Sequence, residues 1–506
     1  MTDATAPGDL EPAVFRELGY RTIDIMTEHY ANVTNVETLP DRSPQAVAAL
    51  FDEPLPETGV DPDDLLADWV ERIYPNAAHN GSPRWFGYVK GSGTQVGALA
   101  DALAASVNMN AWGQIGGPSA AEVERQTIEW LSELIGYHDD AGGVLTSGGS
   151  MANHTAIYAA LQRASDFEAG ERGLRALDGS GRFTLYTSAH EHHSSVERVA
   201  SMIGIGTDAI RYVPCDESYR LDPEALEAMV IDDEEAGHTP FCAIAQVGSI
   251  NVGAIDPLEA MADVCERHDL WFHADGACGA VGACLPELED DFAGLERADS
   301  VTLDPHKWLS VPYACGCVLF RDATVQARTY AMDAEYLDRM ADDAYHGMDY
   351  SSMGPELSRP FRALKVWMSL KHRGLEGYRD QFRRSLRCAE HLHELVREAD
   401  DFEVLHEPTL FIYSFRYVPA DLGRSERTKE PVEAYLDWVN QRITDEVRRT
   451  GEAFVTTTGV DERTVLRLSI CSHRTTIDDI DRTFELLRHH GERIDREERS
   501  AWLDRD

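Results

Sequence analysis

Lysine is nearly absent from this sequence: 506 residues contain five lysines against 41 arginines. Basic residues as a group are also few, since 46 lysines and arginines face 89 aspartates and glutamates, for a formal net charge of −43. A surface of this sign repels a phosphate backbone, which excludes nucleic acid as a partner. So much acid with so little lysine indicates adaptation to concentrated salt, where screening weakens repulsion between carboxylates, and therefore an extreme halophile as the source.

Long apolar runs are missing as well. No stretch is long enough to span a bilayer, and the first residues lack the charged and apolar regions of a secretory signal, so we expect a cytoplasmic protein with no membrane partner. The nine cysteines are scattered and form no CxxC pair. This pattern predicts reduced thiols, with neither disulfides nor a bound metal.

The chain is nevertheless folded and large. A hydrophobic content of 43% argues against a disordered acidic chain. Its length predicts two or three domains. β-type runs over 182–187, 210–214 and 241–248 alternate with helices that start at Asp222-Pro223 and Asp256-Pro257. This alternation predicts an α/β fold with a mostly parallel sheet, which binds ligands beyond the carboxyl ends of its strands.

One of the five lysines stands in an unusual place. Lys307 lies between the β-type runs 300–303 and 315–320, directly after His306. A lysine can lose its proton and form a Schiff base, whereas a guanidinium cannot. The alternative is a partly buried lysine that reaches solvent along its stem. Asp275, at the end of the run 269–275, supplies a carboxylate at an earlier strand end.

The motifs DPHKW around Lys307 and HADGA around Asp275 resemble those of the group II pyridoxal-phosphate-dependent amino-acid decarboxylases, the family of the aromatic-L-amino-acid decarboxylases. The resemblance extends from about residue 15 to 489. It implies fold type I, as in aspartate aminotransferase, with a mostly parallel central sheet, a helical N-terminal arm and a small α+β C-terminal domain. It also implies pyridoxal 5'-phosphate as the cofactor.

The resemblance assigns a role to each residue of this site. Lys307 would hold the cofactor as a Schiff base, Asp275 would pair with the ring nitrogen, and His193 would stack on the ring. The remaining residues implied at the cofactor are Ala277 beneath the ring, Gly149, Ser150 and His306 at the phosphate, and Asp304 beside it. Asp304 has an alternative role, capping the turn or orienting His306. His190 and His192 are read as structural, not as metal ligands.

The segments that resemble the family's substrate pocket are polar here. Tyr88 keeps the family pattern, but Val89 and Lys90 depart from it, as does Asn110 two residues before Trp112. We expect Tyr88, Val89, Asn110 and Trp112 to contact the substrate, and a polar function on the substrate would explain the departures. The alternative is that Asn110 is an ordinary loop or cap residue.

A loop of weak periodicity covers 321–358. Its length is typical of a functional lid or a flexible excursion. By the resemblance, Tyr350 corresponds to the mobile-loop tyrosine that protonates the substrate carbon after CO₂ departs, with Tyr345 as a nearby competitor. The expected catalytic residues are therefore Lys307, His193 and Tyr350.

The expected organisation is an N-terminal helical arm over 1–94, a large cofactor-binding domain over 95–375 and a small domain over 376–506. The sequence thus predicts decarboxylation of an L-amino acid, with an aromatic one such as tyrosine, DOPA or tryptophan leading. Aspartate, glutamate or 2,4-diaminobutyrate decarboxylation, an aminotransferase, and a non-catalytic cofactor-binding protein stay open as alternatives. The resemblance also implies a homodimer.

Overall fold

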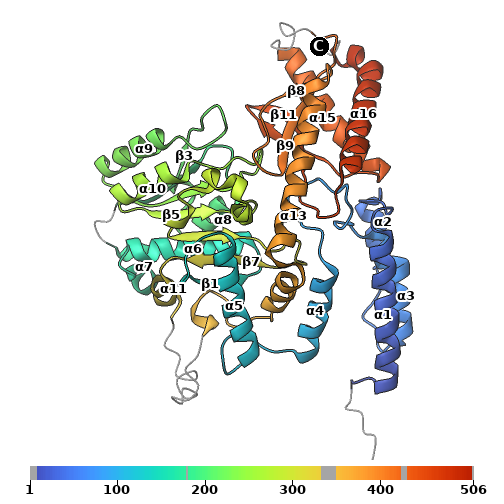
Figure 1. Cartoon of the computed structure of the whole chain (residues 1–506), viewed down its shortest axis with the longest axis horizontal. Helices are drawn as coiled ribbons and strands as arrows, with labels where there is room; N and C mark the ends of the chain where they lie inside the picture. The colour runs from blue at the N-terminus through green and yellow to red at the C-terminus, as the bar shows by residue number, and fades with distance from the viewer. Residues whose placement is uncertain (1–7, 178–180, 332–348, 423–429, 504–506) are drawn as a thin grey trace, which may run out of the picture.

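A computed structural model describes residues 8–177, 181–331, 349–422 and 430–503. In these ranges it contains a seven-stranded sheet, a four-stranded sheet and a separate pair of N-terminal helices (Figure 1). No helix within the same ranges is both long and apolar enough to cross a membrane.

The large sheet is mostly parallel, as predicted. Its strands follow the order β1-β7-β6-β5-β4-β2-β3, in which β7 runs antiparallel to both of its neighbours and the other pairs are parallel. The strands are β1 (Gly142–Thr146), β2 (Phe183–Ser188), β3 (Ile210–Val213), β4 (Thr239–Gln246), β5 (Trp271–Asp275), β6 (Ser300–Leu303) and β7 (Gly316–Phe320). Every residue of β2, β5, β6 and β7 is buried, because helices cover both faces of the sheet.

Crossover helices make these two layers. In Figure 1, α9 and α10 lie above the sheet and α6 and α7 below it. Asp222 caps α9 by accepting from two backbone N–H groups, and a proline follows it at the first position, as the sequence predicts. The helices of this part are α4 (Gln95–Val107), α5 (Pro118–Leu134), α6 (Gly149–Ala164), α7 (Glu168–Arg172), α8 (Ser195–Met202), α9 (Pro223–Glu235), α10 (Leu258–Arg267) and α11 (Ala323–Tyr330).

The long helix α13 (Ala363–Glu398) leads from the large sheet to the C-terminal one. Gly374 interrupts it with φ of 67°, a left-handed conformation that glycine adopts at no steric cost. The four-stranded sheet beyond it is antiparallel, in the order β10-β11-β9-β8. Its elements are β8 (Phe402–Val404), β9 (Ile412–Tyr417), α15 (Glu430–Thr450), β10 (Thr456–Val460), β11 (Arg463–Ser469) and α16 (Ile477–Leu503).

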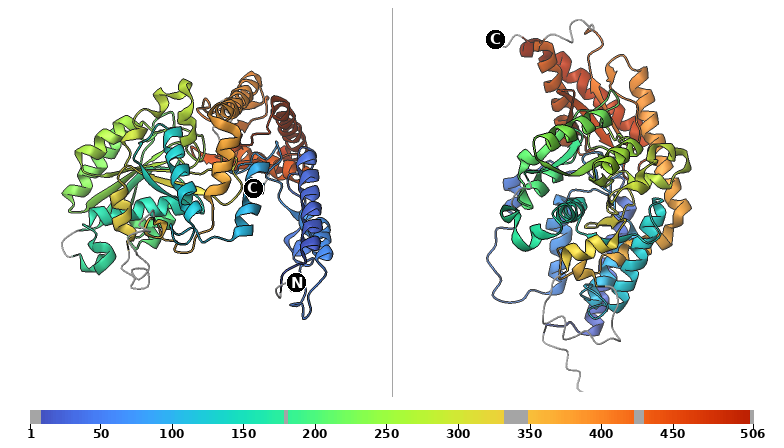
Figure 2. Two further views of the ribbon diagram at one scale, coloured as in Figure 1. Left: turned by 60° about the horizontal axis from the view of Figure 1, so that its bottom comes forward. Right: turned by 90° about the vertical axis from the view of Figure 1, so that its left-hand side faces the viewer.

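The N-terminal helices stand apart from both sheets. α1 (Pro12–Asn32) and α3 (Pro62–Asp68), with the short α2 (Pro44–Ala48) nearby, project beyond the body of the molecule (Figure 2). No residue of α1 is buried, and its large apolar side chains Phe15 and Tyr20 are each 67% exposed. Apolar side chains this exposed on a helix indicate a face that another surface covers.

Candidate active site

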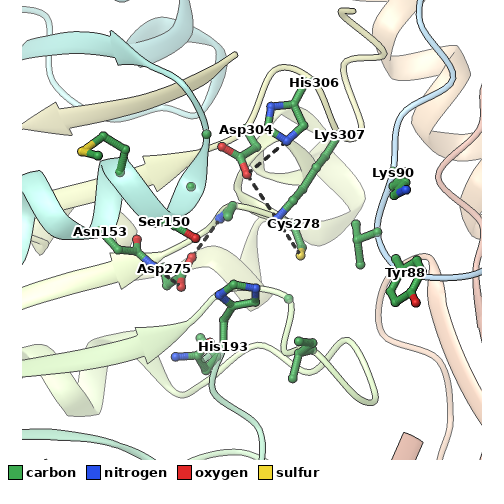
Figure 3. A pocket seen from close by; sticks show the side chains of 18 of the residues that line it. Tyr88, Lys90, Ser150, Asn153, His193, Asp275, Cys278, Asp304, His306 and Lys307 are labelled. Carbon is green, nitrogen blue, oxygen red and sulfur yellow. Dashed lines mark hydrogen bonds and ion pairs between the residues drawn. The ribbon is translucent and has the colours of Figure 1, made fainter. Parts of the chain in front are cut away.

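The strands β5 and β6 bring the two predicted site segments together. They pair in parallel with Asp275 opposite Thr302, so the residues that follow both strands leave the sheet at the same edge. The chain turns at Asp304 directly after β6 and reaches Lys307 three residues later. Figure 3 shows both side chains at one cavity, close to Asp275.

Lys307 is held by two polar partners. Its Nζ lies 3.2 Å from Asp304 Oδ2 and 3.6 Å from Cys278 Sγ. Burial acts to lower the pKa of Lys307, but Cys278, Asp304 and Asp275 act in the opposite direction, and together they raise it. The amine is therefore protonated and ion-paired until a ligand displaces this arrangement.

Asp275 is oriented by an amide that the sequence analysis did not single out. Asn153 donates from Nδ2 to Asp275 Oδ2 at 2.7 Å, and the backbone N–H of Ala277 donates to Oδ1 at 3.2 Å. Asn153 Oδ1 in turn lies 3.2 Å from His273 Nε2. The signal for Asn153 is its place in the second turn of the helix after Gly-Gly-Ser, where one side chain can reach across the strand ends.

The predicted phosphate cradle is the start of α6. First-turn N–H groups of a helix have no acceptor within it, and here they open onto the cavity at Gly149 and Ser150. A Cβ on Gly149 would stand 2.8 Å from Asp304 Oδ2, so only glycine permits this approach. His306 accepts from the backbone N–H of Cys315 through Nδ1 at 3.1 Å, which leaves Nε2 to donate.

His193 lines the same cavity, and burial lowers its pKa. Its Nδ1 accepts from the backbone N–H of Ser195 at 3.1 Å, so the ring is fixed and neutral near pH 7. His192 instead bonds Glu197 at 2.6 Å and the carbonyl of Ser188 at 2.8 Å. It therefore has the structural role that was expected of it.

The cavity measures about 450 Å³. Tyr88 and Val89 line it as predicted, together with Lys90. Further lining residues that were not predicted to act are Ser147, Gly148, Met151, Gln246, Gly248, Ile250, Cys278, Tyr313 and Arg467. Arg467 is 6% exposed, and its Nε and Nη2 are buried without a hydrogen-bond partner among the described residues.

Three predicted residues lie elsewhere, which corrects the expectation. Tyr350 is 1% exposed in the hydrophobic core, 5.0 Å from the guanidinium of Arg359, and does not line the cavity. Asn110 Oδ1 accepts from the backbone N–H of Arg359 at 2.8 Å, and Trp112 follows on the same segment, also outside the cavity. The competing Tyr345 lies outside the described residues. Spacing along the chain could not reveal that this segment turns inward at Tyr350.

The residues present fit pyridoxal phosphate. The cavity joins an amine, a fixed carboxylate, a neutral histidine and a helix start where glycine keeps the backbone open (Figure 3). The amine is an attachment point, the carboxylate a partner for a ring nitrogen and the helix start an anion site. Asp304 Oδ1 is buried at the same corner, and no described residue donates a hydrogen bond to it.

Comparisons with known proteins agree with this chemistry. Residues 44–418 match the family model described as pyridoxal-dependent decarboxylase conserved domain. The chain is 32% identical to an aromatic-L-amino-acid decarboxylase of Bacillus atrophaeus, over 92% of this chain and 93% of the relative. A crystal structure of Oryza sativa TDC with PLP and tryptamine superposes with a TM-score of 0.88 at 26% identity, covering 97% of this chain and all of that one.

Mouse CSAD gives the same TM-score of 0.88 at 26% identity, over 95% of this chain and 99% of that one. The same fold therefore occurs in relatives with different names. The amine, the fixed carboxylate and the helix start occupy one cavity of that fold. The chain belongs to the pyridoxal-phosphate-dependent amino-acid decarboxylase family.

Proposed function

We propose that this protein decarboxylates aromatic L-amino acids to the corresponding amines and CO₂. The observation that carries the proposal is the pairing, in one cavity, of Lys307 with an Asp275 carboxylate held by Asn153. The aromatic preference is supported by the Bacillus atrophaeus relative and by the rim of the cavity, where Tyr88 is 57% exposed.

Each residue of the site has a distinct task in this reaction. Bound pyridoxal phosphate supplies an electron-poor ring that accepts the electron pair left as CO₂ departs. Lys307 would hold the cofactor through its amine, and Asp275 would keep the proton on the ring nitrogen, which favours developing negative charge. His193 would cover one ring face, with Ala277 on the other. His193 and Lys307 both line the cavity, and either could return a proton to the substrate carbon.

Arg467 is our candidate for the substrate carboxylate. Its guanidinium is buried at the cavity wall, no described residue accepts from its Nε or Nη2, and burial lowers its pKa. A carboxylate would satisfy those donors with charge-assisted hydrogen bonds. The same contact would fix the orientation of the substrate, which decides the bond that breaks.

We also infer a homodimer. Leu99, Leu103 and Val107 recur every four residues on α4 and are 44%, 55% and 63% exposed, which makes one apolar stripe. The exposed apolar side chains of α1 form a second such surface. A second copy would cover both and would place the nearby Asn110 and Trp112 at the interface. Nine free thiols support a cytoplasmic location, and the charge of −43 supports a halophilic source.

The test is CO₂ release from a panel of L-amino acids in concentrated KCl with added pyridoxal phosphate, with Lys307→Ala as the control. Release from tyrosine, DOPA or tryptophan that the lysine variant loses is the expected result. Release only from aspartate, glutamate or 2,4-diaminobutyrate would overturn the aromatic assignment. Oxo acid formed without CO₂, when an acceptor is supplied, would show an aminotransferase. Cofactor binding with neither product would show a non-catalytic protein.

A further inference from the structure

Lys90 is a charged group without a counterion at the mouth of the cavity. Although the chain has 89 acidic residues, no carboxylate of the described part lies within ion-pair distance of its Nζ, and no side chain or backbone group there accepts a hydrogen bond from it. Lys307 and Lys365 each have an aspartate partner at 3.2 Å. Lys371 has none, but it is exposed to water.

Two aromatic rings hold the Lys90 ammonium instead. Its Nζ lies 5.1 Å from the ring centre of Trp85 and 5.4 Å from that of Tyr88. Burial lowers the pKa of Lys90, because no oxygen of the described residues replaces the water that the ammonium has lost. Cation–π contacts compensate part of this cost and leave the N–H donors free.

The backbone fixes this segment against the reactive lysine. The N–H of Gly91 donates to the carbonyl of His306 at 3.1 Å, and a Cβ on Gly91 would stand 2.3 Å from the carbonyl oxygen of Lys307. Tyr88 is held at φ of 58°, a left-handed conformation that is costly for a bulky residue. Strain of this kind persists where the surroundings impose it, and here it turns the segment toward the cavity.

Lys90 is placed where it would contact the side chain of a bound substrate. In Figure 3, Tyr88 and Lys90 lie across the cavity from Ser150 and Asp275, with Lys307 between them. Ser150 and Asp275 belong to the cofactor side, and the amine of Lys307 marks where a substrate amine reacts. The side chain of the substrate would therefore extend toward Tyr88 and Lys90.

We propose that Lys90 is a specificity-determining residue that selects aromatic amino acids bearing a ring hydroxyl, by donating a hydrogen bond to that oxygen while the ring packs on Tyr88. This inference rests on the proposed aromatic decarboxylation. A site built to bind a hydroxyl rejects the analogue that lacks it, because the partly desolvated donor is then left without its partner. Lys90 therefore disfavours phenylalanine as well as favouring tyrosine.

The experiment compares kcat/KM for L-tyrosine and L-phenylalanine in the wild-type holoenzyme, in Lys90→Met and in Lys90→Arg. A hydrogen bond from a charged donor predicts a wild-type preference for tyrosine of about 10- to 100-fold. Lys90→Met should bring the ratio close to one, mainly through a higher KM for tyrosine, and Lys90→Arg should restore part of it. Lys371→Met, at an exposed lysine on α13, is the matched control and should keep the wild-type ratio.

A binding measurement keeps the inference testable if Lys90→Met does not fold. Calorimetric titration of the wild-type holoenzyme should give tighter binding of tyramine than of 2-phenylethylamine by about tenfold. Equal binding of the two amines, or a ratio of rates that Lys90→Met leaves unchanged, overturns the role of Lys90 while the decarboxylase assignment stands. Turnover of L-glutamate in place of tyrosine, lost in Lys90→Met, overturns it in favour of a carboxylate. No turnover of either aromatic substrate overturns the proposed function and this inference with it.

Discussion

Asp304 Oδ2 lies 3.2 Å from Lys307 Nζ and 3.7 Å from His306 Nε2, at the corner where Gly149 opens the helix start. The Asp304 carboxylate thus pairs with the amine that would bind the cofactor. It also borders the helix start where the cofactor phosphate would bind. The first contact holds the lysine in position, whereas the second is repulsive toward a phosphate dianion. The two effects can be separated by an uncharged side chain of the same shape.

Asp304→Asn should tighten pyridoxal phosphate binding several-fold, because it removes a negative charge beside the phosphate and ceases to raise the pKa of Lys307. The dissociation constant, followed by the visible absorbance of the lysine-linked cofactor, measures this. Asp322→Asn, which changes a helix cap outside the cavity, is the control. Weaker binding in Asp304→Asn would mean that the carboxylate itself holds the cofactor, directly or through His306.

Tyr350→Phe should leave kcat within about twofold of wild type, since a residue outside the cavity touches no reacting atom. Its hydroxyl is buried without a partner among the described residues, so its loss should keep the free energy of unfolding within about 1 kcal/mol or raise it. Steady-state rates and urea unfolding check both. Tyr336→Phe and Tyr345→Phe, at the other tyrosines between residues 331 and 349, serve as comparison variants. A large loss of rate in Tyr350→Phe alone would restore it as the acid.

Stability should fall in mild acid because histidines are buried in the neutral state. His273 is fully buried, and burial lowers its pKa to about 4, against about 6.5 when unfolded. The folded state therefore binds fewer protons between these values. The stability this group contributes is complete above pH of about 6.5 and is lost as the pH falls toward about 4.

His273→Gln should reduce the pH slope of the unfolding free energy by about 1.4 kcal/mol per pH unit within that window, which is the effect of one proton. Urea unfolding at a series of pH values measures the slope. His372→Gln, at an exposed histidine on α13, should leave it unchanged. An unaltered slope in His273→Gln would show that other groups govern the acid response.

Leu103→Glu should shift the protein from dimer to monomer and lower its activity, because it places a charge in the apolar stripe of α4. Sedimentation in concentrated KCl gives the mass. Ile231→Glu changes a 41% exposed side chain on α9, away from this stripe, and should stay dimeric. A monomeric wild type that is fully active would contradict the proposed assembly.

Added KCl should raise the unfolding temperature, because a net charge of −43 repels itself in the folded state. Screening lengths fall from about 10 Å at 0.1 M to about 3 Å at 1 M salt, so most of this gain should come below about 1 M, and further gains reflect salt-strengthened burial. Thermal unfolding across a KCl series is the measurement. Greatest stability without salt would contradict the halophilic assignment.

The sequence by itself determined which motifs carry the reactive side chains and that these motifs lie at the ends of strands. Lys307 and Asp275 could be found because a lone lysine and a terminal carboxylate follow β-type runs, and parallel strands bring such ends to one edge. The start of α6 was also predicted, since small residues precede a helix at Gly149, whereas its role as a phosphate site rested on the resemblance.

Only the tertiary structure decided which side chains from distant segments meet. Asn153 orients Asp275 across 122 positions of sequence, and Arg467 enters the cavity from the C-terminal sheet. Tyr350 turns into the core although its neighbours in sequence are polar. Local patterns report the period and the ends of elements, but the direction of a loop side chain depends on packing among segments that are not adjacent in the chain.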